Sequence, residues 1–146
     1  MGKRYSSGLC LAVGMTALMA GGSAAAEGAG AYLAARHANM VSDFTEATRY
    51  YAQAMISSPE HVALLDAAII AHICKGDVAG AARIATRLEA AGHSNAVVDL
   101  VQMAADMSDG SFERAISREI AQEGLSPLMD GLIRGWAFLG EGRMSD

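Results

Sequence analysis

The sequence predicts an all-α fold built from paired helices, on the strength of three observations. Alanine, the strongest helix former, occupies 30 of the 146 positions. Proline occurs twice, and the β-branched residues Val, Ile and Thr together occur 19 times, so little in the chain favours strands. Similar residues also recur every 34 positions. The length fits one small domain or a short array of repeats, and 52% hydrophobic residues exclude a disordered chain.

Residues 1–26 are predicted to be a secretory signal peptide and not part of the fold. A short basic stretch is followed by 22 uncharged residues, and the most apolar run, 9–20, is too short to span a bilayer. Three alanines at 24–26 supply an A-x-A pattern, so we expect cleavage before Glu27 and export, in a bacterium to the periplasm. The alternative is an uncleaved anchor in the inner membrane, facing the periplasm, and this is the one membrane association expected.

Residues 27–146 are predicted to form a helical repeat domain, because five kinds of residue recur at a period of 34 or at twice that period. They are an alanine (Ala47, Ala81 and Ala115), an apolar residue three positions earlier (Phe44, Val78 and Phe112), an N-cap before it (Asp43, Asp77 and Ser111), a turn glycine (Gly76 and Gly110) and a proline at twice the period (Pro59 and Pro127). Agreement at one period is a stronger signal than any single motif.

Each unit is expected to contain two helices joined by a short turn. The first unit has helices at about 29–41 and 44–57, and the second begins with Asp43 and Glu46 in a pattern that resembles a capping box. Apolar residues of this helix follow helical spacing. Further helices are expected at about 59–74, 78–91, 95–107, 112–123 and 127–139. One pair cannot bury its own apolar face, so neighbouring pairs must stack.

The period and these recurring residues resemble the tetratricopeptide repeat (TPR) family, in its exported bacterial form. The first unit matches best, with the small residues of the family at Ala35, Ala47 and Ala54 and its bulky aromatic residue at Tyr51. The resemblance implies a right-handed α-solenoid of antiparallel helix pairs, about three and a half repeats long. It covers units at about 28–61, 62–95 and 96–129 and a partial unit at 130–146.

Two features depart from a complete array of this family. Glu119 and Gln122 stand where the second helix of the third unit should be apolar. Residues 127–139 look like the first helix of a fourth unit, and 142–146 repeat the pattern of 110–114, so the next alanine would fall at position 147. The sequence therefore predicts a truncated N-terminal fragment, with a natural capping helix as the alternative.

Catalytic and metal-binding patterns are scarce in the sequence. The four histidines do not pair at i, i+4, and they have no cysteine or carboxylate at a metal-ligand spacing. A Gly-rich phosphate loop, a G-x-S-x-G elbow and an H-E-x-x-H motif are absent from it. We therefore expect no catalysis, no cofactor and no metal. A net charge of −5, or −7 without residues 1–26, argues against a nucleic-acid partner.

Two residues of the apolar run 67–74 could have either a structural or a functional role. His72 is expected to be a core histidine with a hydrogen-bond partner, and a metal ligand is the less favoured alternative. Cys74 is the one thiol left once the signal peptide is removed, so it cannot form an internal disulfide. We expect it to be a small buried hydrophobic residue, with a reactive or intermolecular thiol as the alternative.

The resemblance also implies a function, namely an exported scaffold that binds a protein or peptide partner in a concave groove. The alternative is a non-catalytic repeat segment of a larger envelope enzyme or assembly machine. The groove would be lined by residues three or four apart on the first helix of each unit. Carried over by register, the predicted groove residues are Tyr32, Arg36, Asn39, Asp66, Ile70, Ile73, Leu100, Ala104, Met107, Arg134 and Phe138.

The predicted groove residues have a mixed character. Arg36 and Asn39 can hold a backbone or carboxylate group by directed hydrogen bonds. An apolar floor is offered by four large aliphatic residues, Ile70, Ile73, Leu100 and Met107. We therefore expect an extended or helical partner segment with apolar anchors. The alternative is that those four residues pack against neighbouring helices, because an error of one residue in the register exchanges groove for core.

Overall fold

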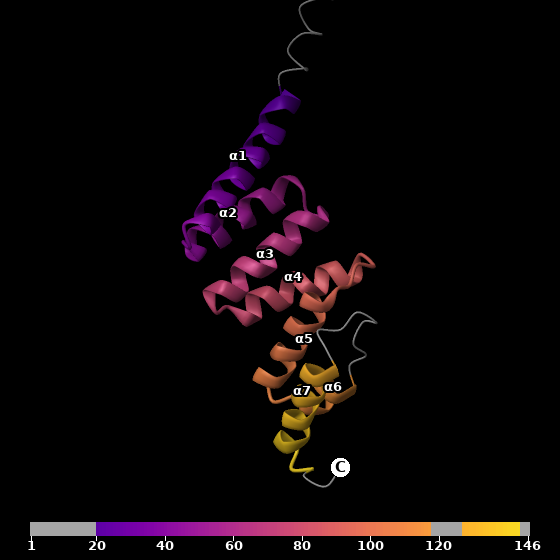
Figure 1. Cartoon of the computed structure of the whole chain (residues 1–146). Coiled ribbons are helices and arrows are strands. Elements are labelled where there is room, and N and C mark those ends of the chain that lie inside the picture. Colours follow the sequence, from indigo (N-terminus) through magenta and orange to yellow (C-terminus); the bar gives the residue numbers. More distant parts are fainter. Residues whose placement is uncertain (1–19, 118–126, 144–146) are drawn as a thin grey trace, which may run out of the picture.

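The computed structural model describes residues 20–117 and 127–143 of the chain (Figure 1). Within these two ranges the regular structure consists of seven α-helices, without a strand, so the all-α prediction is confirmed. The helices are α1 (Ala20–Met40), α2 (Phe44–Ser57), α3 (Val62–Lys75), α4 (Val78–Ala90), α5 (Ala96–Ser108), α6 (Phe112–Ser117) and α7 (Pro127–Gly140).

Most helix boundaries lie close to those expected from the sequence, and α2 has the predicted bounds. The main difference is α1, which begins at Ala20 and so runs through the expected cleavage point before Glu27. The description of α6 stops at Ser117. Its predicted continuation, with the two polar residues that depart from the family pattern, lies outside the described residues, and so do residues 144–146 of the suspected fourth unit.

The two predicted aspartate N-caps explain where α2 and α4 begin. Asp43 Oδ1 accepts a hydrogen bond from the amide of Glu46 at 3.1 Å, and Asp77 Oδ1 accepts one from the amide of Gly80 at 2.8 Å. Each bond satisfies an amide that the first turn of the helix leaves unpaired. The two bonds are 34 residues apart, as the sequence period predicts.

Helix α3 begins a few residues later than the sequence predicts. His61 is the N-cap, and its ring Nδ1 accepts a hydrogen bond from the amide of Leu64 at 3.2 Å. Histidine is not among the residues that favour this position, so propensity gave no signal for it. The helix therefore begins at Val62 and not at Pro59.

The turn glycines end α3 and α5 in the same way. Gly76 and Gly110 have φ angles of +81° and +70°, a left-handed conformation that side chains disfavour. The amide of Asp77 donates to the carbonyl of His72 at 2.9 Å, and the amide of Ser111 donates to the carbonyl of Asp106 at 2.7 Å. These bonds are the ones that close a helix with a glycine just past its end.

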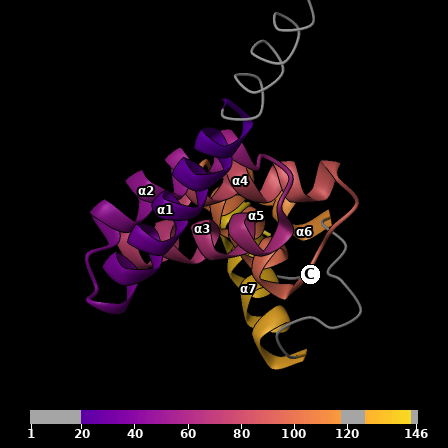
Figure 2. The same cartoon turned by 90° about the horizontal axis from the view of Figure 1, so that it is seen from above.

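The extensive helix contacts join elements that follow one another along the chain, from α1 with α2 through to α6 with α7. Figure 1 shows the helices in chain order, with α1 and α7 at opposite ends, and Figure 2 shows from above that α1, α2 and α3 lie to one side of α5, α6 and α7. One core cluster extends from α1 to α5, and a smaller one joins α5, α6 and α7 through Met103, Ala115 and Ala137. The recurring alanines Ala47 and Ala81 are fully buried, which lets the helices approach closely.

In the last turn of α3, the prediction that Cys74 is buried is wrong, because this residue is exposed. The buried residues of this helix are Leu64, Leu65, Ala68, Ile69 and Ala71. At 100° per residue, position 74 falls outside the arc that these residues cover. The apolar run 67–74 predicted burial of Cys74 because the run continues past the end of the buried face of α3.

His72, by contrast, lies at the edge of the core with a partner. Its side chain is 15% exposed, and its ring Nδ1 lies 3.0 Å from Asp77 Oδ2. A Cβ atom at Gly80 would collide with both side chains, so only glycine fits beneath this pair. The pair therefore joins the last full turn of α3 to the N-cap of α4.

Replacing Asp77 with alanine should lower the free energy of unfolding by about 1 kcal/mol at pH 7, because it removes an N-cap. The hydrogen bond from the Gly80 amide, and then that from His72, hold the pKa of the Asp77 carboxyl below its usual range. A carboxyl with a lowered folded-state pKa stabilises the protein above its unfolded pKa of about 3.9. That contribution is lost as the pH falls from the unfolded pKa through the lower folded pKa, so the difference in stability between parent and variant should shrink as the pH falls below about 4.

Urea unfolding of the two proteins between pH 3 and pH 7 measures this convergence. Asp43→Ala is a matched control, because it removes the equivalent cap at an exposed site, where we expect a smaller loss. Equal losses in the two variants, or a loss at Asp77 that does not change with pH, would contradict the assigned role of the His72–Asp77 pair.

Candidate partner-binding surface

The predicted groove residues lie on α1, α3, α5 and α7, at matching positions 34 residues apart. The structure places all of them outside the buried core. The exposed ones are Arg36, Ile70, Ile73 and Arg134, and the others are half-buried. The expectation that a partner binds these residues stays a prediction.

The helix register explains this exposure. The second predicted groove residue of α1, α3, α5 and α7 is Arg36, Ile70, Ala104 and Phe138, respectively. The residues just before them are Ala35, Ile69, Met103 and Ala137, and their exposed fractions are 0%, 0%, 2% and 0%. Neighbouring residues point 100° apart on a helix, and in all four helices the residue that follows the buried one is half-buried or exposed, so the edge of the core falls between the two positions. Each of these four helices therefore packs with the same register.

The apolar groove residues differ in how far they serve the core. Ile70 and Ile73 on α3 are 46% and 40% exposed, so neither is a core residue. Met107 packs against the smaller core cluster and Tyr32 against the larger one. The alternative that these side chains pack against neighbouring helices therefore describes Met107 and not the two isoleucines.

The α1 end of this surface combines aromatic rings with a cation. The rings of Tyr32 and Tyr51 lie 6.3 Å apart at an angle of 57°, a tilted contact between aromatic faces and edges. Burial raises the pKa of the Tyr51 hydroxyl, and Tyr32 raises it further. Arg36 lowers the same pKa, so the positive charge of its guanidinium acts on the Tyr51 hydroxyl. In the described parts of the chain, no carboxylate forms an ion pair with Arg36. Its charge is therefore available to a ligand.

Asp66, the acidic member of the predicted set, already has a partner within the chain. Its Oδ1 accepts a hydrogen bond from the side-chain amide of Asn95 at 3.2 Å, and Asn95 is in turn the N-cap of α5. This bond joins α3 to the start of α5. Asp66 therefore contributes to the spacing of two successive first helices, which sequence reasoning did not anticipate.

Comparisons with models of known protein families, with curated proteins and with solved structures give no match to this chain.

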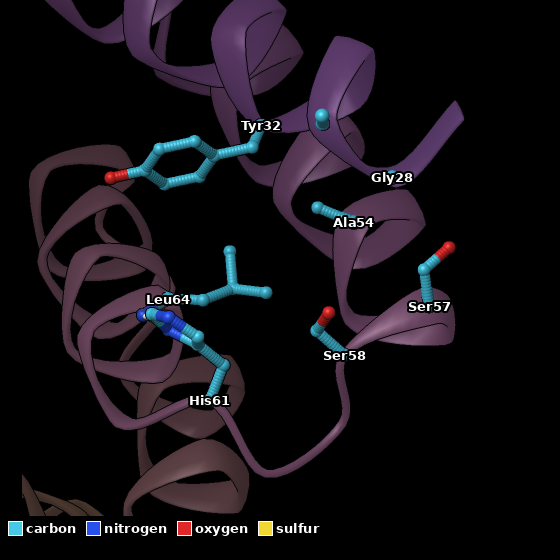
Figure 3. A pocket seen from close by; sticks show the side chains of 8 residues that line it. Gly28, Tyr32, Ala54, Ser57, Ser58, His61 and Leu64 are labelled. Carbon is cyan, nitrogen blue, oxygen red and sulfur yellow. Dashed lines mark hydrogen bonds between the residues drawn. The ribbon is translucent and has the colours of Figure 1, made fainter. Parts of the chain in front are cut away.

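A pocket of about 320 Å³ lies between α1 and the turn that joins α2 to α3. Figure 3 shows Tyr32 and Leu64 on its walls and the hydroxyl of Ser58 directed into the space between them. The lining consists of Gly28, Ala29, Tyr32, Ala54, Ser57, Ser58, His61 and Leu64. Of these, sequence reasoning named only Tyr32 as a site residue. Ser57 ends α2, and Ser58 and His61 lie in the turn before α3; none of the three is among the recurring residues of the repeat pattern.

The arrangement of the described residues also bears on metal binding and on membrane insertion. Within residues 20–117 and 127–143, no group of three or more His, Cys, Asp or Glu side chains is arranged to hold a metal ion. No helix in the described part of the chain has the length and apolar character needed to cross a membrane. The apolar run 9–19 lies outside that part.

Proposed function

We propose that this chain is an exported, non-catalytic scaffold of the TPR type that binds a protein or peptide along the predicted groove residues. In this proposal the helix pairs form a right-handed α-solenoid of about three and a half 34-residue repeats. The observation that carries it is the register. Every predicted groove position stays outside the core on α1, α3, α5 and α7, while the neighbouring position is buried on all four helices.

The recurrence of local structure supports a repeat. The N-cap bonds of Asp43 and Asp77 are 34 residues apart, and so are the left-handed glycines Gly76 and Gly110. The same kind of N-cap and the same kind of glycine turn thus each occur twice at the predicted spacing. Export is supported by the sequence of residues 1–26.

The chemistry of the surface favours a particular kind of partner. Arg36 offers a guanidinium that forms no ion pair with a carboxylate of residues 20–117 or 127–143. Ile70 and Ile73 expose apolar side chains about one helical turn apart, about 4.5 Å along α3. An extended or helical segment with apolar side chains and free backbone carbonyls or a carboxylate matches both features. A mainly acidic partner would meet only two cations among the predicted groove residues, Arg36 on α1 and Arg134 on α7, with Asp66 and apolar side chains between them.

Two double variants test the groove. Arg36→Ala with Asn39→Ala removes the directed hydrogen bonds, and Ile70→Asp with Ile73→Asp removes the apolar anchors. Each should weaken binding of the partner captured from an envelope extract by at least about tenfold. A hydrogen bond to a charged group contributes about 1.5–3 kcal/mol, and full burial of an isoleucine side chain contributes about as much. Stability should change little, because the substituted side chains lie outside the core.

The matched control is Ile56→Asp on α2, an isoleucine that is exposed but belongs to no predicted groove position. It should bind the captured partner as the parent does. Circular dichroism establishes that each variant is folded, and calorimetry with the purified partner measures the dissociation constant. Parent-like binding by both double variants, or unfolding of either one, would mean that the groove assignment is wrong.

A further inference from the structure

The pocket at the α1 end has an apolar interior and a polar, uncharged rim. Tyr32, Ala54 and Leu64 form the interior, and Ala54 and Leu64 are themselves buried. Ser58 and His61 contribute polar atoms at the rim, where both residues are exposed (Figure 3). An apolar interior with a few polar groups is typical of sites that bind a ligand in one orientation.

The lining offers no carboxylate, ammonium or guanidinium as a counter-charge to a charged occupant. The described residues around the pocket include no aspartate, glutamate, lysine or arginine. A charged group that entered would lose water without gaining a counter-charge. The volume of about 320 Å³ lies at the lower end of the range for ligand pockets, so it fits one large side chain with its adjoining peptide groups.

The rim can hydrogen-bond to a peptide backbone. His61 Nδ1 accepts a hydrogen bond from the Leu64 amide, so the proton of the neutral ring is on Nε2, which is a donor. The Ser58 hydroxyl can donate or accept. A peptide group presents one acceptor and one donor, which these two side chains can satisfy together.

The pocket walls are held in place before any ligand binds. A Cβ atom at Gly28 would lie 2.7 Å from Ser57 Cβ, so α1 packs against the Ser57 side chain too closely for a larger residue at position 28. Tyr32 is further held by its tilted contact with Tyr51. A preformed pocket lowers the entropy that binding must overcome.

We propose that this pocket binds one neutral apolar side chain, of leucine or phenylalanine size, from an extended segment of the partner, with the adjoining peptide groups hydrogen-bonded to Ser58 and His61. The inference rests on the proposed function, because it takes the ligand to be a peptide. It adds an anchor point at the α1 end of the groove, where Tyr32 belongs both to the pocket and to the predicted groove residues.

The test uses the full chain and small peptide analogues. N-acetyl-leucinamide and N-acetyl-phenylalaninamide are titrated against the ¹⁵N-labelled protein, with N-acetyl-asparaginamide and N-acetyl-lysinamide as polar and charged comparisons. The first two should bind with dissociation constants on the order of millimolar, as ligands of this size allow. They should shift the amide signals of Ala29, Ser58 and His61, and the other two should bind at least about tenfold more weakly.

A pair of variants ties the binding to the pocket. Ala29 is exposed and lines the pocket, so Ala29→Leu should fill the space and abolish the shifts. Gly30→Leu is the control, because the next residue faces open space and does not line the pocket. The control should bind both apolar analogues as the parent does.

The outcomes separate this inference from the proposed function. Absence of saturable shifts, equal binding of the lysine analogue, or binding that survives Ala29→Leu would each overturn the pocket assignment. If Ala29→Leu leaves binding of the full partner unchanged while the groove double variants abolish it, the pocket assignment fails and the proposed function stands. If the apolar analogues bind as expected while the groove variants bind the partner normally, the pocket assignment stands and the proposed groove fails.

Discussion

Replacing Ile69 with alanine should lower the free energy of unfolding by about 2–5 kcal/mol, whereas the same change at the next residue, Ile70, should alter it by about 0.5 kcal/mol. Ile69 has no exposed surface and packs in the larger core cluster, while Ile70 is exposed on the same helix. Removing a buried side chain loses its transfer free energy and leaves a cavity. The gain in helix propensity is the same at both sites, so the difference between the variants isolates burial.

Urea unfolding followed by far-ultraviolet circular dichroism measures both values, and an unchanged m-value establishes that the compared states are equivalent. The experiment also tests the register on which the groove depends. If Ile70→Ala is the more damaging change, α3 is rotated by one residue about its axis, and the predicted groove positions of that helix lie in the core.

Enlarging a recurring alanine should be the next most damaging change, and Ala81→Leu is expected to cost about 1–3 kcal/mol. Ala81 is fully buried where α4 packs against its neighbours, so a larger side chain must push those helices apart. Ala79→Leu is the matched control, since Ala79 is exposed on the same helix and leucine has nearly the helix propensity of alanine. The control should stay within about 0.5 kcal/mol of the parent.

Thermal unfolding compares these two variants directly. For a domain of this size, 1 kcal/mol corresponds to a few degrees Celsius in Tm, so Ala81→Leu should melt clearly below Ala79→Leu. If the two variants melt at the same temperature, the helices around α4 are not in close contact at this position. The 34-residue recurrence of alanine would then reflect helix propensity and not packing.

Local signals account for the parts of the fold that the sequence predicted well. Asp43 and Asp77 start helices, and Gly76 and Gly110 end them, through bonds within a few residues of the chain. Such signals depend little on tertiary structure, so a single sequence is enough to interpret them. The family resemblance placed Ala47, Tyr51 and Ala54 in the pattern of the first unit, and all three are buried.

Features that depend on neighbouring elements were beyond the sequence. Cys74 is exposed because the buried face of α3 does not extend to it, and the apolar run gave no sign of that limit. His61 acts as an N-cap through a ring nitrogen, which residue preferences do not predict. The pocket brings Gly28 and Ser58 together from different elements, and only the packed structure shows that they meet. The outward positions of Arg36 and Ile70 followed from the register, and their binding role stays a prediction.

The succession of contacts from each helix to the next has a consequence for how the molecule folds and opens. Contacts between sequence neighbours close short loops, so little chain entropy is lost before they form, and such topologies have low contact order and fold quickly. The cost of local opening need not be uniform along such a chain. α7 is held by the smaller core cluster at one end, whereas α3 and α4 have packed helices on both sides. Backbone amides of the central helices should therefore exchange with solvent most slowly, and a partner that spans several helices would stabilise them as one cooperative unit.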